Sequence, residues 1–144
     1  MSPLPLVLDT NVVLDLLVFE DPSLGVLARA LASGAVSAWA DEHTLRELQY
    51  VLAYPTFRLD VAAQRAVHTR YQGLVRLAPE AGVTPARALP RCRDRDDQKF
   101  LELAARAGAR WLVSKDKRVL SMADRAGLPF GILSCRQLVA RLSG

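Results

Sequence analysis

The chain has 144 residues, of which 51% are hydrophobic and 24% charged, a balance typical of a folded globular protein and unlike that of a disordered one. No apolar run approaches the roughly 20 residues that span a membrane, two cysteines (Cys92 and Cys135) are too few for a disulfide framework, and the start lacks the basic region of a signal peptide. We therefore expect a cytoplasmic protein with a single domain over residues 1–144. The net charge of +4 permits a polyanionic partner without requiring one.

The first half of the chain alternates short apolar segments with amphipathic ones. Leu6–Leu8 is an apolar run that ends on Asp9, which predicts a buried strand with a carboxylate at its carboxyl end. Apolar residues at helical spacing predict a helix directly after it. The other elements expected here are a helix from Pro22 to Gly34, a strand over Val36–Ala40, a helix capped by Asp41 that ends before Pro55, and one long helix over residues 60–78.

The second half continues this alternation after a loop over Pro79–Cys92, which contains three prolines and a glycine. Short strands that alternate with helices indicate an α/β domain with a mostly parallel sheet. Such sheets bind ligands beyond the carboxyl ends of their strands. The elements expected in this half are a helix from near Asp96 to Gly108, a strand over Trp111–Ser114, a helix to about Arg125, a strand over Phe130–Leu133 and a helix over Arg136–Leu142.

Asp97 is the most informative residue of the sequence. Phe100, Leu101 and Ala104 follow it at helical spacing, so all four share one helix face, and that face must point into the core. The expected result is an inward-facing carboxylate in the first turn of a helix, where the helix dipole offsets part of the cost of burying it. The alternative is a capping role for this cluster, with Asp94 or Asp96 at the N-cap and Asp97 at the third helical position.

Three further acids complete a candidate constellation. Glu47 lies at the margin of the apolar stripe of its helix and suits an exposed surface equally well, while Asp9 and Asp116 could each simply cap the following helix. Four carboxylates in one cleft repel each other unless a cation neutralises them. Oxygen ligands suit Mg²⁺ or Mn²⁺, whereas the histidines and cysteines show no zinc-ligand spacing.

Four segments in chain order resemble the motifs of PIN domains. The match extends from residue 6 to about residue 135, and it is closest to the bacterial subgroup regarded as toxin components of toxin–antitoxin pairs. The segments are Leu8–Val12 (LDTNV), Thr44–Leu48 (TLREL) with Val51 and Leu52, Arg93–Leu101 (RDRDDQKFL) and Trp111–Lys117 (WLVSKDK).

This resemblance implies a three-layer α/β/α sandwich with about five strands, and cleavage of RNA phosphodiesters with Mg²⁺ or Mn²⁺. It also implies an antitoxin protein as a partner and self-association as a homodimer. Lys115 stands where a small residue, often glycine, is usual in the family, and Ser114 where threonine is commoner. Carried over by position, the catalytic metal ligands are Asp9, Glu47, Asp97 and Asp116, and the supporting polar residues are Thr10, Asn11 and Ser114.

The mechanism implied is in-line attack on a backbone phosphate by a water that the metal activates. Cations around the acids would position the strand through its phosphates without reading its sequence. The candidates are Arg87, Arg91, Arg93, Arg95, Lys99 and Lys115, and the apolar residues that suggest self-association are Val18, Phe19, Trp39 and Tyr54.

Three alternatives compete with this interpretation. A phosphatase that uses a phospho-aspartate would carry Asp-x-Asp at the first strand, whereas the chain has Asp9, Thr10 and Asn11 there. A phosphoacceptor signalling domain needs its acidic pair at the first strand, whereas Asp96 and Asp97 come late. A PIN-like scaffold that binds RNA or a partner protein without cutting is the strongest alternative, and a cleavage assay separates it from an enzyme.

Overall fold

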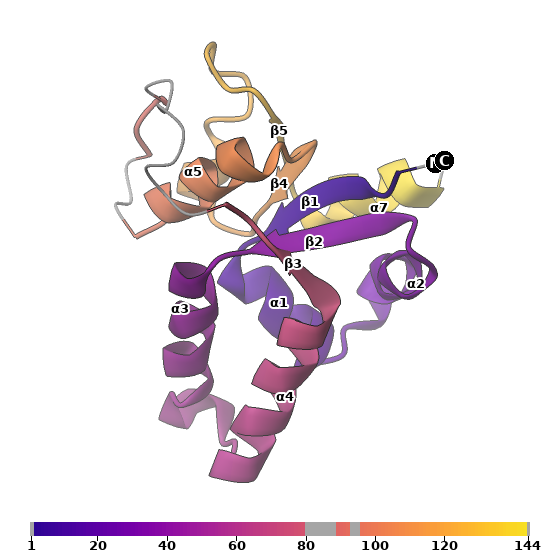
Figure 1. Cartoon of the computed structure of the whole chain (residues 1–144), viewed down its shortest axis with the longest axis vertical. Helices are drawn as coiled ribbons and strands as arrows, with labels where there is room; N and C mark the ends of the chain where they lie inside the picture. The colour runs from indigo at the N-terminus through magenta and orange to yellow at the C-terminus, as the bar shows by residue number, and fades with distance from the viewer. Residues whose placement is uncertain (1, 80–88, 93–95, 144) are drawn as a thin grey trace.

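The computed structural model describes residues 2–79, 89–92 and 96–143 (Figure 1). Its sheet has five strands in the order β3-β2-β1-β4-β5, and every neighbouring pair is parallel. This confirms the predicted α/β fold with a parallel sheet of about five strands. The strands are β1 (Leu4–Leu8), β2 (Val36–Ala40), β3 (Val75–Leu77), β4 (Trp111–Val113) and β5 (Gly131–Leu133).

Helices cover both faces of the sheet and make the structure a three-layer sandwich (Figure 1). Successive residues of a strand point to opposite faces, and in β1 Leu6 and Leu8 join one buried cluster while Val7 joins the other. The first cluster contains residues of α1 (Thr10–Leu17), α2 (Gly25–Ser33), α3 (Glu42–Leu52), α4 (Val61–Leu74) and α7 (Cys135–Ser143), and the second those of α5 (Gln98–Ala107) and α6 (Lys117–Leu120).

Short 3₁₀ turns and helix caps join these elements. The turns are η1 (Pro22–Leu24) before α2 and η2 (Pro55–Phe57) after α3. Gly34 and Gly108 end α2 and α5 in the left-handed conformation, as their positions in the sequence predict. Among the described residues, no helix is both long enough and apolar enough to cross a membrane.

The prediction of one helix over residues 60–78 is wrong at its C-terminal end. The helix α4 stops at Leu74, and Val75–Leu77 forms β3, which pairs with β2. The backbone N–H of Ala78 extends this pairing by donating to the carbonyl of Ala40 at 2.9 Å. The unpaired edge of β2 supplies the physical reason, because its backbone groups gain partners only if the chain leaves the helix there.

Two other helices are shorter than predicted. The helix α6 ends at Leu120 and is followed by turns, although the sequence suggests a helix to about Arg125. The helix α5 begins at Gln98, so Asp97 is its N-cap and does not lie within its first turn. Most of the predicted loop before α5 falls on residues 80–88, which lie outside the described part of the chain.

Two glycines should respond in opposite ways to replacement by alanine. A Cβ on Gly131 in β5 would lie 2.9 Å from Cδ1 of Trp111, whereas a Cβ on Gly73 in α4 would meet nothing within 4 Å. We expect Gly131→Ala to lower the free energy of unfolding by about 1–3 kcal/mol through overpacking. The control, Gly73→Ala, should raise it by about 0.5–1 kcal/mol because glycine is unfavourable within a helix. Urea denaturation of both variants tests this, and equal effects would contradict it.

Candidate functional site

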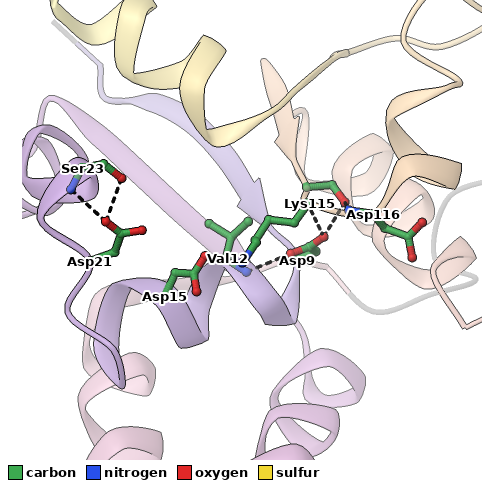
Figure 2. A network of polar contacts seen from close by, with 8 residues as sticks. Asp9, Val12, Asp15, Asp21, Ser23, Lys115 and Asp116 are labelled. Atoms are coloured by element: carbon green, nitrogen blue, oxygen red, sulfur yellow. Dashed lines mark hydrogen bonds and ion pairs between the residues drawn. The ribbon is translucent and has the colours of Figure 1, made fainter.

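Asp9 lies at the carboxyl end of the central strand β1 and is 5% exposed. As the N-cap of α1 it accepts a hydrogen bond at Oδ1 from the backbone N–H of Val12 at 3.0 Å. Its Oδ2 accepts the hydroxyl of Ser114 and, at 3.2 Å, the backbone N–H of Lys115 (Figure 2). The carboxylate is therefore buried where β1 and β4 end side by side.

Burial raises the pKa of the Asp9 carboxyl above its ordinary value. The hydrogen bonds from Ser114, Val12 and Lys115 oppose this effect, and the charge of Asp116 adds to it, so the net shift is upward. A buried carboxylate with a raised pKa is destabilised in its charged form, and a cation next to it would relieve that cost.

Ser114 connects Asp9 to Asp116. Its side chain is fully buried, donates to Asp9, and accepts the backbone N–H of Asp116 at 3.0 Å. Asp116 is also the N-cap of α6, because its Oδ1 accepts the backbone N–H of Arg118 at 2.7 Å. The capping roles expected for Asp9 and Asp116 are thus both present, and they coexist with the position of these acids at neighbouring strand ends.

Glu47 faces the same end of the sheet from α3. Its Oε2 accepts the hydroxyl of Thr10, the first residue of α1, and its Oε1 lies 2.5 Å from Nζ of Lys99 in α5. Lys99 also donates to the carbonyl of Asp96 at 2.6 Å. Glu47 therefore links the start of α1 to the start of α5. The sequence alone does not predict these contacts, because the position of Glu47 on its helix suits an exposed glutamate equally well.

Asp97 is half-buried at the start of α5, and its Oδ2 is buried and accepts no hydrogen bond from the described residues. The predicted inward face holds for Phe100, Leu101 and Ala104, which are all buried. Sequence reasoning missed Gln98, which is 8% exposed and accepts the backbone N–H of Cys92 at 2.7 Å. Its spacing of three residues from Leu101 is the signal that could have found it.

Several predicted residues lie elsewhere. Asn11 is exposed in the first turn of α1, and Arg91 is exposed before α5. Asp94, Arg87, Arg93 and Arg95 fall outside the described residues. Tyr71 of α4 is buried, and burial, and secondarily the charge of Asp9, raise its pKa, so its hydroxyl belongs to the electrostatic surroundings of the site.

Asp9, Asp116 and Glu47 thus lie near the carboxyl ends of the strands and Asp97 at the start of α5, but the four acids do not form a closed cage. Within the described residues, no three His, Cys, Asp or Glu side chains lie close enough to hold one metal ion. Asp9 and Asp116 are linked through Ser114, while Glu47 is held by Thr10 and Lys99. The candidate metal ligands are all carboxylate oxygens, and burial raises the pKa of the Asp9 carboxyl. The chemistry of these four side chains therefore fits a hard divalent cation.

Comparisons with known proteins identify the fold and the family of this chain. The crystal structure of PAE2754 from Pyrobaculum aerophilum superimposes with a TM-score of 0.58 at 16% identity, covering 99% of this chain and 93% of that one. At this identity the likeness shows the fold alone. A search of curated proteins finds no match. The family model described as PIN domain matches residues 5–118, which include Asp9, Glu47, Asp97 and Asp116. The chain therefore belongs to the PIN-domain family, whose members are in general nucleases.

Proposed function

We propose that this protein is an endoribonuclease that hydrolyses RNA phosphodiester bonds with Mg²⁺ or Mn²⁺. The observation that carries the proposal is the buried carboxylate of Asp9, held by three donors at the carboxyl end of the central strand. That edge is where open α/β sheets bind ligands. Membership of a family of nucleases supports the reaction class.

Asp9 and Asp97 would hold the principal ion, with Asp116 and Glu47 completing the site directly or through water. A divalent cation in such a site activates water and stabilises charge on the phosphoryl oxygens. Thr10 and Ser114 orient the carboxylates of Glu47 and Asp9 through their hydroxyl groups. Threonine is commoner than serine at position 114 in the family. Serine also carries a hydroxyl group, so this departure leaves the role of the residue intact.

Lys99 is the described cation best placed to contact the substrate. Its ammonium lies between Glu47 and the carbonyl of Asp96, and its side chain is 15% exposed. A cation bound by the acids would compete with Lys99 for Glu47 and leave the ammonium available for a phosphate of the RNA. Such a contact positions the strand without reading its sequence, and exposed Arg91 lies on the segment that leads to α5.

The test of this function is cleavage of mixed RNA in the presence of Mn²⁺, with EDTA and duplex DNA as parallel samples. We expect cleavage of the RNA with Mn²⁺ and none with EDTA, and slow or no cleavage of the duplex. RNA that is bound but stays intact with Mn²⁺ would favour the non-cutting scaffold. Equal cleavage of the duplex would contradict the choice of RNA.

We further propose a toxin role with an antitoxin protein as partner, and a homodimer. An aromatic cluster supports association. It contains Phe19, which follows α1, and Tyr54 and Phe57, which follow α3. The ring centroid of Phe57 lies 5.9 Å from that of Phe19 and 6.5 Å from that of Tyr54. Phe19 is 57% and Tyr54 53% exposed, and exposed apolar patches often mark interfaces. Light scattering at high concentration would detect the dimer.

A further inference from the structure

Lys115 makes two different contacts with the part of the molecule that carries Asp9. Its backbone N–H donates to Oδ2 of Asp9 at 3.2 Å. Its side chain turns away from Asp116 and crosses to α1, where its ammonium lies 2.7 Å from Oδ2 of Asp15 (Figure 2). The same residue therefore touches the carboxylate that caps α1 and a second carboxylate further along that helix.

These contacts link the turn Ser114–Asp116 to α1 at two points. Asp9 begins the helix and Asp15 lies within it, so a rigid element joins the two carboxylates. The ion pair with Asp15 restrains the turn relative to α1. This turn also supplies two of the three hydrogen-bond donors to Asp9, the hydroxyl of Ser114 and the backbone N–H of Lys115.

The number of donors on Asp9 explains why the position of this turn matters. An ionised carboxylate has about four lone-pair sites on its two oxygens. Val12, Ser114 and Lys115 occupy three of them. One site is left to accept a cation, and the direction in which it points depends on where the turn holds the carboxylate.

We propose that Lys115 is a positioning residue for Asp9, because its ion pair with Asp15 holds the turn that orients the remaining lone pair of the Asp9 carboxylate toward a metal ion. This inference rests on the proposed metal-dependent function. It also means that the ammonium of Lys115 pairs with Asp15 and does not serve as a phosphate contact. The role expected for Lys115 from the sequence therefore changes from substrate binding to orientation of a metal ligand.

The positive charge of Lys115 by itself would weaken metal binding, whereas its positioning role would strengthen it. The two effects can therefore be distinguished by experiment. A lysine ammonium near Asp9 repels a divalent cation bound there, so a residue that acted only through its field would weaken metal binding. Removing it would then strengthen the binding. Removing a positioning residue weakens it instead, because an ion pair with one partner half-exposed still restrains the turn.

The experiment measures the Mn²⁺ affinity of the full chain by calorimetry and by the Mn²⁺ spin-resonance signal. We expect Lys115→Met and Asp15→Asn each to weaken binding roughly threefold to fivefold, the range of a partly exposed ion pair. The double variant should bind no more weakly than either single one, because both remove the same contact. Lys115→Arg should restore the affinity, and the KM for RNA at saturating Mn²⁺ should stay unchanged in every variant.

Lys117→Met is the matched control, since Lys117 is an exposed lysine two residues away in α6. It should bind Mn²⁺ at least as tightly as the parent protein. Tighter or equal binding by Lys115→Met, or effects of Lys115→Met and Asp15→Asn that simply add, would overturn the positioning role. If the parent protein binds no Mn²⁺, the proposed metal-dependent function fails together with this inference. If it binds Mn²⁺ and Lys115→Met does not differ, the inference alone fails.

Discussion

Replacing Asp9 or Asp97 by asparagine should lower the rate of RNA cleavage by about 10³-fold or more. The amide keeps the shape of the side chain but removes the charge that holds a divalent cation, and a loss of about 4 kcal/mol in transition-state stabilisation corresponds to that factor. Asp9 is buried at the end of β1, and Asp97 lies half-buried with its Oδ2 buried at the start of α5. Initial rates with Mn²⁺ on one RNA substrate provide the measurement.

Two exposed aspartates give the matched controls. Asp96 precedes Asp97 in the same cluster, and Asp124 lies in the turns after α6. Asn variants at both positions should retain activity within about twofold, since surface substitutions away from a site have small effects. Circular dichroism of all four variants verifies that they are folded. Equal loss at Asp96, or full activity of Asp97→Asn, would show that the wrong acid of the cluster has been chosen.

Mn²⁺ should stabilise the folded protein by about 2.7 kcal/mol when its concentration is one hundred times the dissociation constant. The physical reason is that the ion binds carboxylates of the native state and not of the unfolded chain, and offsets the cost of the buried charge of Asp9, which the charge of Asp116 increases. Thermal melts with Mn²⁺ and with EDTA measure the effect. The difference should shrink in Asp97→Asn and persist in Asp124→Asn. Identical melts of the parent protein in both solutions would speak against a metal site.

The same melts have a pH dependence whose sign follows from Asp9. Because burial raises the pKa of Asp9 in the folded state above its value in the unfolded chain, its favourable contribution is present at low pH and is lost as the pH rises through the raised pKa. In EDTA, the parent protein should therefore lose stability relative to Asp9→Asn as the pH increases from about 4 toward neutrality. Saturating Mn²⁺ should reverse this trend, since the ion stabilises the charged form. A relative stability that rises with pH in EDTA would contradict the assignment.

Local patterns in the sequence determined most of the secondary structure and the position of two acids. The apolar runs of β1 and β2 and the cap of α3 at Asp41 depend on side chains close together in the chain, so they can be predicted without knowing the fold. The positions of Asp9 and Asp116 in the fold can be predicted because each residue comes at or just after the carboxyl end of a strand that the sequence itself indicates. The parallel sheet also follows in outline, because short strands that alternate with helices are typical of parallel sheets with helical crossovers.

Contacts between distant segments were decided by the tertiary structure alone. Val75–Leu77 becomes a strand because β2 offers an open edge, although its own residues continue a helical pattern. Glu47 joins the site because Thr10 and Lys99 meet it across three helices. Lys115 turns toward α1 because Asp15 lies there. In each case the free energy comes from a partner that the chain supplies far away in sequence, so no local pattern can reveal it.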